Sequence, residues 1–227
     1  MKILDSSNSN FDKDLKSILK IRFEQKDNNV DEIVKNIISE VVKKGDEALF
    51  FYANKFDKTV INSSNILLSD KIRKSYKDKI DLSVMDSFKV AIKNITNFHK
   101  KQIPLNYEID NDNNKTSSIW KPIQSVGLYI PGGKSAYPSS LIMNIVPAIV
   151  AGVKRIVITT PSYKNIINPY ILALLDEFSV DEVYQIGGAH AIAALAYGTE
   201  SIEAVNKIFG PGNSYVSTAK KEVFGKV

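Results

Sequence analysis

Residues 126–160 read VGLYIPGGKSAYPSSLIMNIVPAIVAGVKRIVITT and contain a complete strand–helix–strand pattern. The apolar run at 126–130 predicts one buried strand, and the run at 155–160 predicts a second. Residues 139–153 between them are apolar almost all round, which predicts a helix that is buried on every side. Two short strands joined by such a helix predict a parallel pair with a crossover connection.

The same alternation continues toward residue 227. Asn168 and Pro169 predict the start of a helix, because asparagine caps helices and proline is tolerated in their first turn. The further predicted elements are strands at 183–186 and 207–209 and helices at 168–178, 189–198 and 213–224. Short strands that alternate with longer helices are typical of an open, doubly wound parallel sheet, so we predict an α/β fold with such a sheet.

The first half of the chain has a different character, mostly helical and rich in charge. Residues 1–29 are polar and predict an N-terminal arm with one amphipathic piece. Apolar residues at helical spacing over 30–56 predict a helix that ends at Gly45 and a second helix capped by Asp46. The other predicted elements are a short strand at 66–68, helices at 70–77 and 81–101, and a turn at 109–115 between two strands. We therefore place a domain boundary near residue 125.

The composition excludes several classes of protein. The chain has 227 residues, of which 44% are hydrophobic and 24% charged, as in an ordinary globular protein. It has no apolar run long enough to span a membrane, and its N-terminus has no signal-peptide pattern. The chain has no cysteine and only two histidines, His99 and His190, so a mechanism that needs several histidines cannot be complete within it.

The net charge of +5 does not predict nucleic-acid binding. The excess is almost all lysine, which is spread along the chain and mixed with acidic residues. Arginine, the side chain that most often reads bases, occurs only as Arg22, Arg73 and Arg155. We interpret the lysines as a solvated surface, with neither nucleic acid nor membrane among the expected partners.

Three predicted strands end in glycine and run directly into a helix, at Gly132-Gly133, Gly187-Gly188 and Gly210-Pro211-Gly212. Ligands of open α/β sheets bind at the carboxyl ends of the strands, where helix N-termini favour anions. The residues that would face such a crevice are Lys134, Ser135, His190, Asn213 and Tyr215. The pattern predicts a cofactor or phosphate site, although glycine turns also occur for packing alone.

No standard nucleotide-binding motif is complete. Gly133-Lys134-Ser135 is similar to the end of a phosphate loop, but Leu128 occupies the place of that motif's first glycine. Gly210-Pro211-Gly212 begins like a dinucleotide fingerprint, but Tyr215 replaces its third glycine.

The two histidines have different surroundings in the sequence. His99 lies among lysines at the end of a predicted helix, which favours a solvated side chain. His190 follows Gly187-Gly188-Ala189 at the start of a small-residue helix. Its imidazole can either pack in the core or contact a ligand, and the sequence leaves both interpretations open. The helix dipole disfavours a positive charge at this end of a helix, so we expect the neutral form of His190.

Three segments of the chain resemble the histidinol dehydrogenase family. The first is residues 126–161, the second is GGAHAIAALAYGTESIEAV at 187–205, and the third is KIFGPGNSYVSTAKKEVFGKV at 207–227. The phrases GLYIPGG, AIAALAYGTE and GPGN in this order are not a general α/β pattern. The segment VKKGDEALFFYANKFD at 42–57 is a weaker match.

The resemblance implies a zinc-containing oxidoreductase that uses NAD twice, to oxidise L-histidinol through histidinal to L-histidine in histidine biosynthesis. It also implies a cytoplasmic homodimer with two incomplete Rossmann-like domains. In that arrangement residues 1–29 are an arm, 30–125 the first half of a split, mostly helical α/β domain, and 126–227 the cofactor-side domain. Three residues match the NAD-binding positions of the family: Tyr129, His190 and Asn213.

Two features depart from the family pattern. His190 stands where the family usually has glutamine. The chain stops at Val227, roughly halfway through the usual length, so the resemblance places the family's acid–base pair and zinc ligands beyond it. We therefore assign no catalytic residue and no metal ligand, and expect the chain alone to be inactive. The alternatives are a related dehydrogenase of another small polar alcohol, such as a sulfonated diol, and a non-catalytic nucleotide-binding module.

Overall fold

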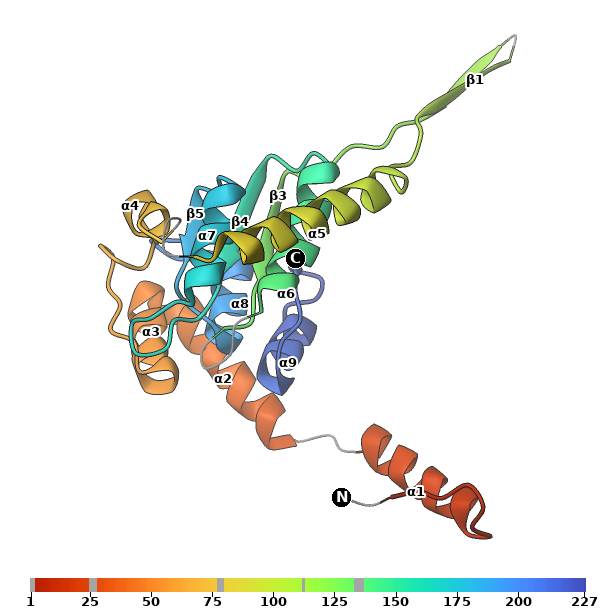
Figure 1. The fold of residues 1–227 in the computed structure, drawn as a ribbon, viewed down its shortest axis with the longest axis vertical. Coiled ribbons are helices and arrows are strands. Elements are labelled where there is room, and N and C mark those ends of the chain that lie inside the picture. Colours follow the sequence, from red (N-terminus) through yellow and green to blue (C-terminus); the bar gives the residue numbers. More distant parts are fainter. Residues whose placement is uncertain (1–2, 25–27, 77–79, 112, 133–136) are drawn as a thin grey trace.

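The computed structural model describes residues 3–24, 28–76, 80–111, 113–132 and 137–227, and a four-stranded parallel sheet lies at its centre (Figure 1). The strands follow the order β5 (Glu182–Tyr184), β4 (Arg155–Thr159), β3 (Ser125–Tyr129) and β6 (Lys207–Phe209). Helices cover both faces of this sheet. The prediction of an α/β fold with a parallel sheet is confirmed.

One face of the sheet is covered by α6 (Pro138–Val150) and α7 (Pro169–Glu177). Outside them, α5 (Leu82–Lys100) packs on α6, and the short α4 (Asp70–Lys74) packs on α7. The start of α7 follows the sequence prediction, because the Asn168 side chain accepts a hydrogen bond from the Tyr170 N–H at 2.9 Å.

The other face of the sheet is covered by α8 (Gly188–Tyr197), which α2 (Asn28–Lys44) and α9 (Ser214–Glu222) enclose. Nearly every residue of α8 is buried, as its small apolar side chains allow. The helix α3 (Asp46–Tyr52) follows α2, contacts α8 and continues into a short π-helix, η1 (Ala53–Asp57). This layer therefore combines helices from both ends of the sequence.

The central strand β3 distributes its side chains between the two layers. It is buried along its whole length, because it pairs with β4 on one side and with β6 on the other. Leu128 packs in the core under α6, and Tyr129 packs in the opposite core under α8. Gly127 lets α8 approach closely, since a Cβ there would lie 3.0 Å from the Leu195 side chain.

Two segments extend away from the sheet (Figure 1). One is the N-terminal helix α1 (Phe11–Glu24), which coincides with the predicted amphipathic piece of the arm. The other is the antiparallel hairpin of β1 (Tyr107–Asn111) and β2 (Asn114–Ser118), whose strands take up most of the predicted turn at 109–115. No helix in the described part of the chain combines the length and the apolar character that crossing a membrane requires.

Two local predictions were wrong in detail. Asp46 does not cap α3, because Gly45 occupies the N-cap with φ of 53° and the Asp46 carboxylate accepts hydrogen bonds from Ser201 instead. The predicted strand at 66–68 is reduced to a single antiparallel bridge between Leu67 and Tyr184, at the outer edge of β5. The chain turns into α4 immediately afterwards, which leaves no room for a longer ladder.

The division of the chain near residue 125 stays a prediction. The sheet is built only from residues beyond that point, as the change in sequence character suggested. However, α2 and α5 come from before it, and each contributes side chains to one of the two cores that the sheet forms. The two parts are therefore packed together on both faces of the sheet.

Candidate cofactor-binding site

The carboxyl ends of the four strands meet at one side of the sheet, which we call the carboxyl edge. The chain runs from β3 to β4 and β5 in one direction, and β6 then returns to the other side of β3. Such a reversal is where ligands of open α/β sheets bind. Gly210 fixes the β6 loop there, because its φ is 119° and a Cβ would overlap the Tyr129 carbonyl oxygen.

Tyr129 is the last residue of β3 and lies at the centre of the carboxyl edge. Its side chain is buried, and its hydroxyl oxygen accepts a hydrogen bond from the Gly188 N–H at 3.2 Å. Tyr129 therefore joins the end of the central strand to the start of α8. Burial raises the pKa of Tyr129, so the hydroxyl keeps its proton and can still donate a hydrogen bond.

His190 lies in the first turn of α8 and is only 1% exposed. Its ring centroid lies 5.8 Å from that of Tyr52 and 6.2 Å from that of Phe56. Neither ring nitrogen has a hydrogen-bond partner. Burial lowers the pKa of His190 to about 3, so the imidazole is neutral, with one donor and one acceptor. The neutral form agrees with the sequence prediction, but its cause is desolvation.

Asn213 is the N-cap of α9, where its side-chain oxygen accepts a hydrogen bond from the Val216 N–H at 3.1 Å. Asn213 is exposed, and so is Tyr215 in the first turn of α9. Asn213 follows Gly210 by three residues and so stays close to the end of β3. The other two predicted crevice residues, Lys134 and Ser135, lie outside the described residues.

The structure adds two polar residues that the sequence did not single out. Thr159 ends β4 and is completely buried, and its hydroxyl oxygen has no hydrogen-bond partner. Asp57 ends η1, and burial raises the pKa of its carboxyl to about 6. A polar residue at the carboxyl end of a predicted strand was a usable signal for Thr159. No comparable signal marks Asp57, because it reaches the edge through tertiary packing.

The described residues do not supply a metal centre. No group of three or more histidine, aspartate or glutamate side chains among them converges as a metal site would require. The residues present therefore do not fit the zinc ion that the family resemblance implies.

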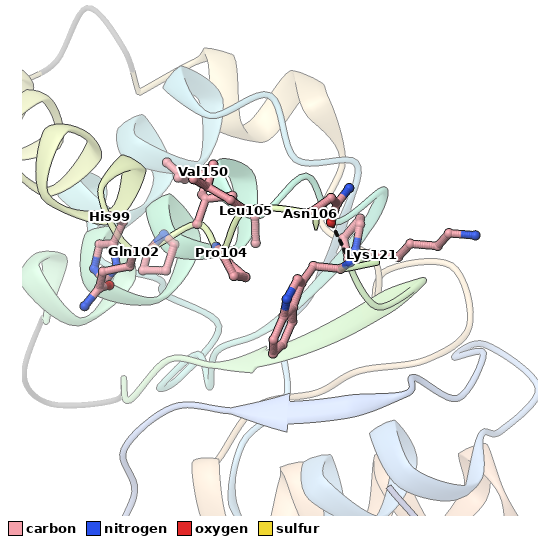
Figure 2. Close-up of a pocket in the computed structure, with 12 residues that line it drawn as sticks. His99, Gln102, Pro104, Leu105, Asn106, Lys121 and Val150 are labelled. Atoms are coloured by element: carbon pink, nitrogen blue, oxygen red, sulfur yellow. Dashed lines mark hydrogen bonds between the residues drawn. The ribbon is translucent and has the colours of Figure 1, made fainter. Parts of the chain in front are cut away.

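A separate groove of about 530 Å³ lies at the base of the hairpin, beside the amino ends of the strands (Figure 2). His99 lines this groove from the last turn of α5 and is half-buried, which is less solvated than the sequence predicted. Its twelve lining residues include no carboxylate. They cannot form an acid–base pair with His99, so the carboxyl edge is the better candidate site.

The fold defines an open parallel α/β protein whose topological reversal is a candidate ligand site, the class that contains the dinucleotide-binding domains. Residues 20–227 match the sequence model of the family described as histidinol dehydrogenase. The chain is 48% identical to histidinol dehydrogenase from Listeria innocua over 211 residues, which cover 91% of this chain and 49% of that protein. It is 40% identical to histidinol dehydrogenase from Gluconobacter oxydans over 228 residues, which cover 100% of this chain and 53% of that protein.

A solved structure gives the same result. The crystal structure of histidinol dehydrogenase from Elizabethkingia anophelis superposes with a TM-score of 0.81 at 32% sequence identity, and covers 86% of this chain and 45% of that one. The chain therefore belongs to the histidinol dehydrogenase family. It spans about half the length of the curated relatives it matches.

Proposed function

We propose that the chain supplies the NAD-binding part of an enzyme that oxidises L-histidinol through histidinal to L-histidine, in histidine biosynthesis. The family membership supports the reaction. The observation that carries the assignment of the site is the buried, neutral His190, whose two ring nitrogens have no partner at the edge where dinucleotides bind.

Three residues would hold NAD in this proposal. Tyr129 would donate through its hydroxyl hydrogen, because its oxygen already accepts from Gly188. His190 offers one donor and one acceptor, as does the side-chain amide of Asn213, and such pairs suit the polar groups of a nucleotide. NAD when bound would accept hydride from the alcohol. The part of these residues is to bind and orient the cofactor.

Zinc chemistry and proton transfer are not assigned to this chain. The described residues hold no cluster of three metal ligands, and both nitrogens of the buried histidine lack a carboxylate partner. We therefore derive no catalytic step from them. Zinc and the acid–base pair remain expectations that rest on the family resemblance.

The homodimer and the cytoplasmic location are further parts of the proposal. Exposed apolar side chains on and beside the hairpin support contact with a protein partner, among them Tyr107, Ile109, Ile119 and Trp120. Light scattering on the enzyme to which this chain contributes should give twice the mass of its polypeptide. A mass equal to one polypeptide would contradict the dimer.

NAD binding is tested by titration calorimetry on the chain and on Tyr129→Phe. Loss of one hydroxyl in the site should weaken NAD binding about 5- to 10-fold, as expected for one hydrogen bond. Tyr184→Phe is the matched control, because Tyr184 ends β5 but its hydroxyl points back to Glu182, the first residue of that strand. Equal affinities of the wild type and Tyr129→Phe would reject this position of the site.

The reaction is tested by deleting the gene in its source organism. The deletion strain should grow with added L-histidine and fail with added L-histidinol. Growth without either supplement would reject the proposed reaction and favour a dehydrogenase of another polar alcohol or a non-catalytic nucleotide-binding module.

A further inference from the structure

Unpartnered buried polar atoms gather at one place in the molecule. Among the described residues, five buried side-chain nitrogen or oxygen atoms have no hydrogen-bond partner. Four of them are Asp57 Oδ2, Thr159 Oγ1 and the two ring nitrogens of His190. Thr159 and His190 are more than nine-tenths buried. Buried polar groups are nearly always satisfied, so a cluster of unsatisfied ones indicates a place for a polar ligand.

The topology explains why these groups are neighbours. Thr159 pairs with Tyr129 in the parallel register, so both side chains face the α8 layer. The hydroxyl of Tyr129 contacts the first residue of α8, and His190 follows two residues later. Asp57 comes from the distant η1, and its carboxylate lies near enough to Tyr129 to help raise the pKa of that hydroxyl.

The end of η1 is fixed to the loop after β4 by hydrogen bonds that do not use the Asp57 carboxylate. The Asp57 carbonyl oxygen accepts a hydrogen bond from the Lys164 N–H at 3.2 Å, in the loop after β4. The Thr59 hydroxyl donates to the Ser162 carbonyl oxygen at 3.0 Å. These bonds hold the loop without using the Asp57 carboxylate oxygen Oδ2, which stays available for a ligand.

Aromatic side chains cover this cluster. Phe56 stacks on Tyr52, with ring centroids 5.5 Å apart, and both rings lie against His190. Phe56 is 48% exposed, so it is the outer of the two rings. It belongs to η1, and π-helical turns are frequent at functional sites. An aromatic ring beside unpartnered polar groups is suited to a ligand with both a flat and a hydroxylated part.

The local charges favour hydroxyl groups over phosphate. Burial is the only cause of the raised pKa of Asp57, so no cation in the described part of the chain compensates its charge. The Lys55 ammonium lies over the Phe56 ring, 5.5 Å from its centroid. The nearby Lys58 ammonium donates to the Lys55 carbonyl oxygen, and the Lys164 ammonium lies over the Tyr163 ring. An uncompensated carboxylate repels phosphate but accepts hydrogen bonds well from a sugar diol.

We propose that Asp57 is a further cofactor-binding residue, which accepts a hydrogen bond from a ribose hydroxyl of NAD beside Tyr129, Thr159 and His190. This inference rests on the proposed NAD site. It adds a residue from the helical first half of the chain to a site otherwise built from the sheet.

The test is titration of NAD into the wild type, Asp57→Asn and the control Asp86→Asn, which removes an exposed carboxylate on α5. Asp57→Asn should weaken NAD binding about 10-fold, and Asp86→Asn should not change it. Deoxy analogues of NAD, each lacking one ribose hydroxyl, are titrated in parallel. One analogue should bind the wild type about 10-fold more weakly than NAD does. The same analogue should bind Asp57→Asn as tightly as NAD does, because the missing hydroxyl and the missing carboxylate remove the same hydrogen bond.

Thermal unfolding separates a binding role from a structural one. Asp57→Asn should unfold at the same or a higher temperature, since it removes an unpartnered buried charge. Weaker NAD binding together with a lower unfolding temperature would indicate a structural role and overturn the proposal. Unchanged or tighter NAD binding by Asp57→Asn would also overturn it. If Tyr129→Phe then still weakens binding, the NAD site stands without Asp57, and if the wild type binds no NAD, both proposals fail.

Discussion

The two ends of the parallel sheet differ in how their polar groups are satisfied. At the amino edge, the Arg155 guanidinium donates to both carboxylate oxygens of Glu182 at 2.7 and 2.8 Å. It also donates to the carbonyl oxygens of Glu203 and Ala204. Ser125 and Asn206 join β3 to the start of β6 by three further hydrogen bonds, of 2.8 to 3.1 Å.

At the carboxyl edge, by contrast, buried polar atoms of Asp57, Thr159 and His190 have no partner. Leaving such atoms unsatisfied costs free energy, whereas the network at the amino edge contributes to stability. The difference teaches that the amino edge serves to hold the strands together. The carboxyl edge keeps hydrogen-bonding groups that no side chain in the described part of the chain satisfies, and the following predictions test this contrast.

The largest effect is expected from Gly210→Ala, which tests whether the backbone of the carboxyl edge is rigid although its side chains are unsatisfied. A Cβ at this position overlaps the Tyr129 carbonyl oxygen, and φ of 119° is itself unfavourable for alanine. We expect the free energy of unfolding to fall by more than about 3 kcal/mol in denaturant titrations.

The matched control for this change is Gly225→Ala. Gly225 also has a positive φ, of 91°, but a Cβ there would meet no atom within 4 Å. Gly225→Ala should lower the free energy of unfolding by about 1–2 kcal/mol, which is the cost of the backbone conformation alone. Equal losses in the two variants would mean that the contact between Gly210 and Tyr129 is not rigid.

A smaller effect is expected at the amino edge from Arg155→Met, which keeps much of the side-chain volume and removes the charge. The variant leaves Glu182 and two carbonyl oxygens without their donor, in a partly buried position. The free energy of unfolding should fall by about 2–3 kcal/mol. NAD affinity at a temperature where the variant is folded should not change, and a large loss of affinity would break the contrast between the edges.

The exposed ion pair on the hairpin provides the control for Arg155→Met. Lys115 and Glu108 lie 2.9 Å apart, with both side chains more than half exposed. Exposed pairs contribute little, so Lys115→Met should cost less than about 1 kcal/mol. The comparison isolates the effect of burial on an ion pair.

The smallest effect is expected from His190→Gln and appears only in acid. In the unfolded chain His190 takes up a proton below its ordinary pKa of 6.5, whereas in the folded protein its pKa is about 3. The wild type should therefore lose stability as the pH falls through 6.5, by about 1 kcal/mol between pH 7 and pH 5.5. His190→Gln should lack this loss relative to the wild type.

The control for this pH effect is His99→Gln, which removes the only other histidine. It should leave the acid-dependent loss in place. The same loss in His190→Gln as in the wild type would show that the imidazole is not held neutral by burial.

The sheet could be predicted from the sequence because its determinants are local. The strands at 126–130 and 155–160, the buried helix between them and the Asn168 cap each depend on neighbouring residues. The carboxyl ends of these strands then predicted that His190 and Asn213 lie at one side of the sheet, whereas Tyr129 was singled out only by the family resemblance. No local pattern in the sequence predicts that the rings of Tyr52 and Phe56 lie against His190.

Asp57 could not be predicted as a site residue for the same physical reason. It reaches the carboxyl edge only because the loop after η1 is hydrogen-bonded to the loop after β4, more than a hundred positions later in the sequence. Asp46 shows the same limit, since its side chain bonds to Ser201 and not to its own helix. Contacts between distant segments leave no periodicity in a single sequence.

Trp120 has a consequence for spectroscopy. It is the only tryptophan of the chain, and it lines the groove at the hairpin base, next to the amino edge. With 61% of its surface exposed, its emission reports on solvent around the hairpin and would shift to the blue if that groove were covered. The carboxyl edge lies at the opposite end of the strands, so tryptophan emission should respond to association at the hairpin and not to a ligand at the carboxyl edge.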